Sequence, residues 1–254
     1  MKLLLKIAYL GTHYCGYQVQ SNGVSIQQML NSAAREVFGT ECDIVGCSRT
    51  DSGVHARGFC ATVSERGKES LCTAIPVSRV PRALNVCLPS DITVLEARVV
   101  ADAFHARYDV VSKEYEYLFY NGAERDPFLR DRAWHIPQKI DNDALAAMQR
   151  AAAAFVGKRD FSACRAMGST QTHTAVRTVY AANVTRNGDL ISFRVRADGF
   201  LYHMVRIMAG TLIAVARGKI SAEEIPARLQ AGKRQGMGTT APPEGLYLDR
   251  VYYE

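Results

Sequence analysis

The sequence has no run of apolar residues that approaches the roughly 20 residues of a membrane-spanning helix. It also lacks a C-x-x-C pair, and its seven cysteines are odd in number and scattered. That pattern is typical of free thiols in a reducing compartment rather than of a disulfide framework or a zinc site. The segment from Met1 to Ile7 has a basic start, but Lys6 interrupts its apolar run. The segment is therefore typical of a first strand rather than of a signal peptide. We therefore expect a cytoplasmic protein with no membrane segment, no disulfide and no metal.

The length and composition are typical of a folded protein. The 254 residues suffice for one large core or for two domains of ordinary size. Apolar residues make up 48% of the chain and charged residues 22%, proportions that argue against disorder. The net charge of +6 is consistent with a polyanionic partner, although a basic surface kept for solubility explains it equally well.

The first half of the chain alternates between strand and helix patterns. Apolar residues at helical spacing predict one helix over 25–38, with Ser25 as its N-cap, and another over 78–86, with Pro81 in its first turn. Apolar runs predict strands at 3–9, 43–47, 58–63 and 91–99. The resulting order, βαββαβ, is the ferredoxin-like pattern.

The second half repeats this order. Strands are predicted at 112–120 and 246–253, and a hairpin joins 177–185 to 190–197 through Asn187-Gly188, a pair that favours a type I′ turn. Asp141 caps a predicted helix that Gly157 ends, and an apolar helix follows over 202–216. We therefore expect an α+β fold of two ferredoxin-like halves with antiparallel sheets, one over 1–108 and the other over 109–254.

One stretch between two predicted strands, Gly46 to Ala56, concentrates polar side chains. Within eleven residues it holds a cation (Arg49), a carboxylate (Asp51) and an imidazole (His55). Polar groups at a strand-to-strand connection often carry chemistry. The alternative is a solvated turn in which Gly53 takes the left-handed conformation.

The segment Arg49 to Ala56 reads R-T-D-x-G-V-H-A and resembles the signature of the TruA family of tRNA pseudouridine synthases. Five further segments resemble family motifs in the same order and spacing: Phe104 to Tyr108, Lys113 to Tyr117, Asp160 to Ser162, Phe200 to Arg206, and Ala241 to Leu248. Because these motifs extend over nearly the whole chain, the resemblance is far more specific than one motif would be.

The resemblance implies an isomerase that converts uridine to pseudouridine, with Asp51 as the catalytic aspartate. A carboxylate can act as a nucleophile or as a base, and the sequence leaves open whether Asp51 attacks the sugar, attacks the uracil or removes a sugar proton. Arg49 and Arg206 would favour the ionised carboxylate through their opposite charge. Because the reaction includes no redox step and no phosphate transfer, it requires no metal and no cofactor.

Three aromatic or imidazole positions receive separate interpretations. Tyr115 corresponds to the family's active-site tyrosine, which would stack on the target uracil once that base has left its helical stack. Tyr117 shares the strand face of Tyr115, which leaves open that one of the two belongs only to the core. His55 is interpreted as structural or RNA-facing, and His203 as a packed helix residue rather than a catalyst.

RNA binding is expected of two segments that resemble RNA-binding segments of the family: Phe104, His105, Ala106, Arg107 and Tyr108, and the loop from Gly168 to His173. Lysine and arginine contacts to phosphates would make this binding salt-dependent and add little sequence information. The chain departs from the family pattern at Ser48 and Ser52, where glycine and alanine are common, and at His173, near a usual arginine. The positions that are modified therefore do not follow from the motifs alone.

The resemblance further implies a homodimer that binds tRNA and modifies uridines 38–40 of the anticodon stem-loop, with the active site in a central cleft where the two halves meet. The alternatives are a family member that acts on another RNA, a hydrolytic glycosidase, or a non-catalytic RRM-like RNA-binding protein. Arg57-Gly58-Phe59 matches the opening of the RNP1 pattern, but the next residues break it. A glycosidase normally needs two carboxylates that flank the bond.

Overall fold

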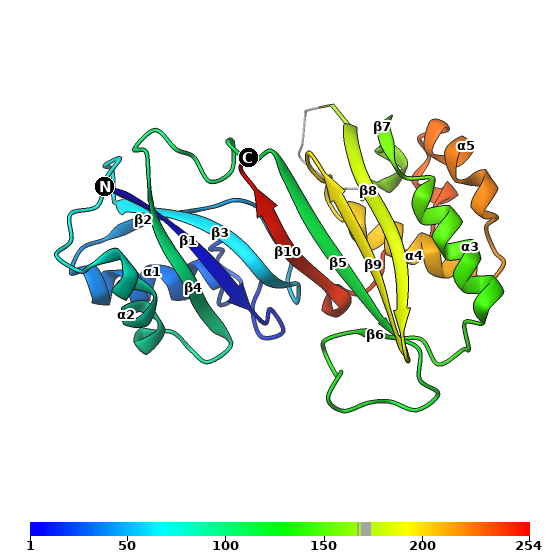
Figure 1. The fold of residues 1–254 in the computed structure, drawn as a ribbon, viewed down its shortest axis with the longest axis horizontal. Coiled ribbons are helices and arrows are strands. Elements are labelled where there is room, and N and C mark those ends of the chain that lie inside the picture. Colours follow the sequence, from blue (N-terminus) through cyan, green and yellow to red (C-terminus); the bar gives the residue numbers. More distant parts are fainter. Residues whose placement is uncertain (167, 169–173) are drawn as a thin grey trace. The chain divides into compact units, whose positions relative to one another are not determined.

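The computed structural model describes residues 1–166, 168 and 174–254, which form two compact units. The first unit comprises Met1–Val111 and Tyr247–Glu254, and the second comprises Ser112–Leu246. Figure 1 shows the elements of each unit along the chain. Each predicted domain also has an expected role: the first, 1–108, carries the Asp51 loop, and the second, 109–254, completes the cleft. These ranges and roles stay predictions.

The first unit has the predicted element order. It contains β1 (Lys2–Tyr9), α1 (Ile26–Phe38), β2 (Cys42–Gly46), β3 (His55–Glu65), α2 (Val80–Cys87), β4 (Ile92–Val100) and most of β10 (Leu246–Tyr252). β1 lies between β4 and β3 and is antiparallel to both. Along the other edge of β3, β2 pairs antiparallel with its C-terminal part, and β10 pairs parallel with its first residues.

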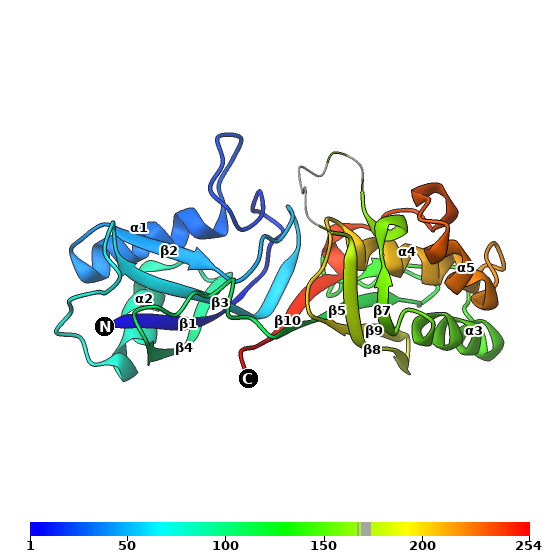
Figure 2. The ribbon, with the colours of Figure 1, turned by 90° about the horizontal axis from the view of Figure 1, so that it is seen from above.

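The helices of the first unit cover one face of its sheet and leave the other open (Figures 1 and 2). On β1, Leu3, Leu5 and Ile7 are fully or almost fully buried, whereas Lys6 is exposed. α1 begins where the Ser25 hydroxyl accepts a hydrogen bond from the Gln28 N–H (3.2 Å), as predicted. The open face of this sheet is therefore available for contacts other than the unit's own core.

The second unit is a four-stranded antiparallel sheet with helices packed against it. It contains β5 (Ser112–Tyr120), β6 (Trp134–His135), α3 (Asn142–Ala153), β7 (Gly157–Asp160), β8 (Val176–Asn187), β9 (Leu190–Ala197), α4 (Met204–Ala216) and α5 (Ile225–Gln230). The strands lie in the order β5-β9-β8-β7, and β6 adds a short parallel pair to β5. α4 is apolar on nearly every side and almost wholly buried, which explains its weak amphipathic pattern in the sequence.

Two local predictions for the second unit are wrong. The hairpin loop is Gly188-Asp189 rather than Asn187-Gly188, because Asn187 pairs with Leu190. Only Gly188 of the loop has a positive φ (59°), as in a type II′ turn, whereas a type I′ turn needs two such residues. α3 ends at Ala153, before Gly157, and Gly157 instead opens β7 with a φ of 115°.

The predicted α+β class is confirmed, since helices and mostly antiparallel strands form both units. No helix within 1–166 and 174–254 is long and apolar enough to cross a membrane.

Candidate active site

The connection from β2 to β3, residues 47–54, presents Asp51 between fixed ends. At its start, the Cys47 N–H donates to the Cys60 carbonyl (2.8 Å) and continues the strand pairing. Near its end, the Val54 N–H donates to the Asp51 carbonyl (3.2 Å) and closes a tight turn. Gly53 has a φ of 78°, so the left-handed conformation predicted for it is present. The Asp51 side chain is half-buried and Arg49 is exposed.

A second segment, residues 10–17 between β1 and α1, supports this loop. The Tyr17 N–H donates to the Thr50 carbonyl (3.2 Å), next to Asp51. On the other side of Asp51, the Ser52 hydroxyl donates to the Tyr14 carbonyl (3.1 Å), which also accepts a longer bond from the Gly53 N–H (3.4 Å). The backbone is therefore held on both sides of the carboxylate.

The supporting segment is itself anchored at the start of β4. The Leu10 N–H donates to the Asp91 carbonyl (2.9 Å), and the Tyr14 hydroxyl donates to the Asp91 carboxylate (2.6 Å). Burial, followed by the bond to this carboxylate, raises the pKa of Tyr14 well above its ordinary value, so the hydroxyl stays protonated and remains a donor.

A buried hydroxyl pair adds a further anchor. The Tyr9 and Thr50 hydroxyls share a hydrogen bond of 2.9 Å, and both residues are less than a tenth exposed. Thr50 directly precedes Asp51, so its side chain and its carbonyl are both fixed by the first unit. A buried hydrogen bond of this kind limits rotation of the adjacent backbone.

Two glycines let the supporting segment approach the loop. A Cβ on Gly16 would lie 2.5 Å from the Thr50 carbonyl oxygen, and a Cβ on Gly11 would lie 2.0 Å from the Val54 carbonyl oxygen. Neither position can therefore hold a side chain without moving the loop. The sequence analysis missed this segment, although two glycines and two tyrosines between a strand and a helix were a visible signal.

His55 is a structural residue. It is fully buried, its Nδ1 accepts a hydrogen bond from the Gly11 N–H (3.0 Å), and its ring packs on Tyr247 at 4.7 Å between centroids. Of the two interpretations kept for His55, structural and RNA-facing, the structure therefore supports the first.

The tyrosine pair on β5 divides into different environments. Tyr117 is fully buried and donates its hydroxyl to the Pro242 carbonyl (2.8 Å), and burial raises its pKa well above the ordinary value. Tyr115 is 6% exposed and contacts the Phe200 ring edge-on at 5.0 Å between centroids. Tyr117 is therefore the core residue of the pair, and Tyr115 is the one left as a site candidate.

Arg206 lies in the first turn of α4 and is tied to the segment after Thr240. Its Nε donates to the Ala241 carbonyl (2.8 Å), while the Ala241 N–H donates to the Arg206 carbonyl (3.0 Å). His203, the N-cap of α4, has a φ of 60°, a conformation that is strained for a residue other than glycine, and its ring stacks on Tyr202. Strained backbone of this kind is often found at functional sites.

The predicted RNA-binding segment 104–108 follows β4 in the first unit. Phe104 packs on Tyr253, and the buried Ala106 accepts a hydrogen bond from the Tyr253 hydroxyl (2.8 Å). Tyr108 is 74% exposed and Arg107 is exposed, whereas His105 is only partly so. The side chains that could reach RNA are therefore mainly those of Arg107 and Tyr108. Of the second predicted segment, Ser169 to His173 lie outside the described residues.

The structure thus holds Asp51 and Arg49 on one loop of the first unit, and Tyr115 and Arg206 on β5 and α4 of the second. In the part of the chain that it describes, no group of three histidine, cysteine, aspartate or glutamate side chains could hold a metal ion. On the first unit, a carboxylate whose backbone is supported and a nearby arginine are suited to acid–base or nucleophilic chemistry.

Comparison with known proteins identifies the family of this chain. The family model described as tRNA pseudouridine synthase matches residues 6–109 and 151–254. The chain therefore belongs to the tRNA pseudouridine synthase family, as its motifs predicted, and the enzyme class is that of the family, an isomerase.

Curated relatives match over nearly their full length. Proteins named tRNA pseudouridine synthase A from Moorella thermoacetica and Acetivibrio thermocellus are 46% and 43% identical to this chain. The first alignment covers 99% of both chains and the second 98% of both. A solved Cbf5-Nop10-Gar1 complex contains a chain that aligns with a TM-score of 0.38 and 13% identity, over 97% of this chain and 48% of its own.

Proposed function

We propose that this chain isomerises uridine to pseudouridine at positions 38–40 of the anticodon stem-loop of tRNA, with Asp51 as the catalytic carboxylate. Family membership over nearly the whole chain supports the reaction. The observation that carries the role of Asp51 is its loop. The backbone is hydrogen-bonded on both sides of this residue, while the carboxylate itself stays half-exposed. Such preorganisation keeps a reacting group in place at no cost during the reaction.

The chemistry needs a carboxylate but no external reactant. The N1–C1′ bond of uridine breaks, the uracil turns, and a C5–C1′ bond forms, while C5 loses a proton and N1 gains one. Asp51 can form a transient bond to the sugar or the base, or take up a sugar proton. Arg49 on the same loop would favour the ionised form of Asp51.

The second unit would complete the site. Tyr115 supplies an aromatic face for the extruded uracil, and Arg206 supplies a positive charge whose guanidinium is already oriented by Ala241. This arrangement requires two ferredoxin-like halves that meet at a central cleft. The RNA is held by the segment Phe104, His105, Ala106, Arg107 and Tyr108, mainly through the exposed side chains of Arg107 and Tyr108, and the enzyme acts in the cytoplasm as a homodimer.

The test is the incubation of the purified protein with uridine-containing tRNA transcripts, followed by site-resolved mapping of pseudouridine. The wild type is expected to modify positions 38–40. Asp51→Asn should abolish turnover and keep tRNA affinity within about twofold, because the amide matches the carboxylate in shape but cannot be ionised. Asp189→Asn, in the exposed hairpin loop, is the matched control.

Each other outcome identifies a specific alternative. If Asp51→Asn leaves RNA binding intact and the wild type also forms no product on any tRNA, the chain is an RNA-binding protein without this activity. Product at other positions, or only on another RNA, would retain the reaction and refute the proposed substrate.

A further inference from the structure

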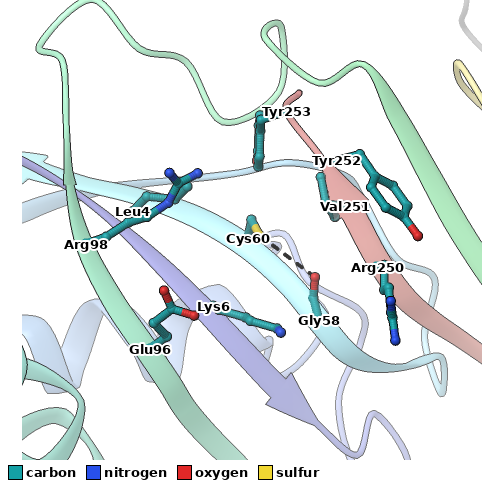
Figure 3. Close-up of a pocket in the computed structure, with 10 residues that line it drawn as sticks. All are labelled: Leu4, Lys6, Gly58, Cys60, Glu96, Arg98, Arg250, Val251, Tyr252 and Tyr253. Carbon is teal, nitrogen blue, oxygen red and sulfur yellow. Dashed lines mark hydrogen bonds between the residues drawn. The ribbon is translucent and has the colours of Figure 1, made fainter.

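A hollow of about 470 Å³ lies on the open face of the first unit's sheet. Its floor is formed by buried residues of β1 and β3, namely Leu4, Gly58 and Cys60. Its rim is formed by charged side chains from three strands, and Figure 3 shows them around the floor. In Figure 2, the segment that supports the Asp51 loop stands on the opposite side of this sheet, with α1. The hollow is therefore separate from the candidate active site.

The rim carries an excess of positive charge. Lys6 of β1, Arg98 of β4 and Arg250 of β10 line the hollow with a single carboxylate, that of Glu96, which makes a net charge of +2 (three cations less one anion). All four side chains are exposed. Register explains their convergence, because Lys6 lies directly opposite Glu96, and Arg98 is two residues further along the same face of β4.

Two of these cations are not neutralised by an ion pair among the residues that the structure describes. Lys6 and Arg98 form no ion pair with any residue in the ranges 1–166, 168 and 174–254, and the Arg250 Nε lies 3.9 Å from an Asp249 oxygen, the limit for a weak pair. Asp249 also pairs more closely with Arg57 (3.3 Å). Both Lys6 and Arg98 favour the thiolate of Cys60, although burial dominates and raises the pKa of that thiol to about 12. Their positive charges are thus directed over the floor.

We propose that this hollow binds phosphate groups of the tRNA substrate that lie outside the target stem-loop. Three exposed cations around a concave floor match a backbone with one negative charge per nucleotide, and such contacts supply affinity without base specificity. A second copy of this chain fits less well, because a two-fold contact would place the excess positive charge of each face opposite that of the other. The inference rests on the proposed function, since it takes tRNA as the substrate.

The hollow is continuous with the predicted RNA-binding segment. Tyr253, which lines it, donates its hydroxyl to the carbonyl of Ala106 and packs against Phe104. Arg107 and Tyr108 are exposed immediately beyond this contact. A strand of RNA that follows Arg107 would therefore reach the hollow without leaving the surface of the first unit.

The test compares four charge variants with one control. Lys6→Gln, Arg98→Gln and Arg250→Gln each remove one positive charge from the rim, and Glu96→Gln removes the negative one. Arg82→Gln makes the same charge change on α2, which covers the opposite face of the sheet. Affinity for full-length tRNA is measured by fluorescence anisotropy from 50 to 200 mM KCl, together with affinity for an isolated anticodon stem-loop.

Lys6→Gln, Arg98→Gln and Arg250→Gln are each expected to weaken binding of full-length tRNA by about five- to tenfold at 0.1 M salt. Each should also reduce the slope of log K against log salt by roughly 0.7–0.9. Glu96→Gln should tighten binding, because it removes a repelling charge. The control should retain both values, and affinity for the stem-loop should change in none of the variants.

Four results would overturn the inference. One is an equal effect of Arg82→Gln, which would indicate a general charge effect. Another is an equal loss on the isolated stem-loop, which would place the contact at the target itself. The third is a rim variant whose mass in sedimentation velocity is half that of the wild type, which would identify the hollow as a contact between copies of the chain. Pseudouridine formation by the wild type is measured in parallel. Its absence would refute the proposed function, whereas its presence with unchanged tRNA affinity in every rim variant would refute only the hollow.

Discussion

Asp51 lies on a loop whose flexibility is restricted at almost every neighbouring residue. Thr50 is fixed through its hydroxyl by Tyr9 and through its carbonyl by Tyr17, and Ser52 is fixed by Tyr14. If Asp51 is the reacting carboxylate, this support of the neighbouring backbone reduces the entropy that it loses in the reaction. Arg49 is exposed on the same loop, and the Arg206 Nε donates a hydrogen bond to the Ala241 carbonyl.

If Arg206 acts on Asp51 through its charge, Arg206→Leu should lower turnover by roughly 10²-fold. Affinity for tRNA should stay within about twofold, because a single partly buried charge that acts on the reacting group contributes little to phosphate binding. The measurement is single-turnover pseudouridine formation beside equilibrium tRNA binding. Arg217→Leu, at the other end of α4, controls for the loss of an arginine on this helix. Equal losses of turnover and affinity would contradict the electrostatic role of Arg206.

At the scale of elements, the Asp51 loop depends on a segment that has no regular structure. Residues 10–17 connect β1 to α1 and pass close enough to the loop that only glycine fits at two positions, Gly11 and Gly16. The segment is fixed in turn at Asp91, where β4 begins. The position of Asp51 therefore depends on β1, α1 and β4 together, in addition to the two strands that the loop itself joins.

Gly16→Ala should lower turnover strongly, because its Cβ would meet the Thr50 carbonyl at 2.5 Å and displace Asp51. We expect a cost of about 1–3 kcal/mol in the free energy of unfolding. Gly67→Ala is the matched control, since Gly67 also has a positive φ (71°) but has open space where the Cβ would stand. Chemical denaturation and pseudouridine assays of both variants are the measurements. A similar turnover for the two would show that the contact with Thr50 does not position the loop.

At the scale of the whole molecule, buried thiols couple stability to alkaline pH. Burial raises the pKa of Cys42 to about 11 and those of Cys60 and Cys164 to about 12. In the unfolded chain these thiols ionise near the ordinary value of about 9. The folded state therefore binds more protons than the unfolded state above that pH, and stability must fall as pH rises.

Between pH 8 and pH 10 the free energy of unfolding should decrease by at least about 1 kcal/mol, since a fully protonated buried thiol costs about 1.4 kcal/mol per pH unit above its unfolded pKa. Urea titrations at both values measure this change. Cys164→Ala, which removes a completely buried thiol, should reduce the difference between the two pH values. A stability that is flat from pH 8 to pH 10 would exclude this coupling.

The sequence alone predicted most of the elements and the family. Apolar periodicity and capping residues act over a few neighbours, so α1 with its Ser25 cap, Pro81 at the start of α2 and the apolar helix α4 could be predicted from local patterns. The same short range explains the errors at Asn187 and Gly157. There the register of a neighbouring strand, rather than the preferred turn residue, decided where the element ended.

Only the tertiary structure decided the roles of individual side chains. It separated Tyr117, bonded to Pro242, from Tyr115, and it showed that His55 is structural. It also joined Tyr9 to Thr50 and gathered the basic rim from strands that are remote in sequence. The physical reason is that burial and hydrogen bonding between distant residues depend on how whole elements pack. A pattern that extends over a few residues carries no record of that packing.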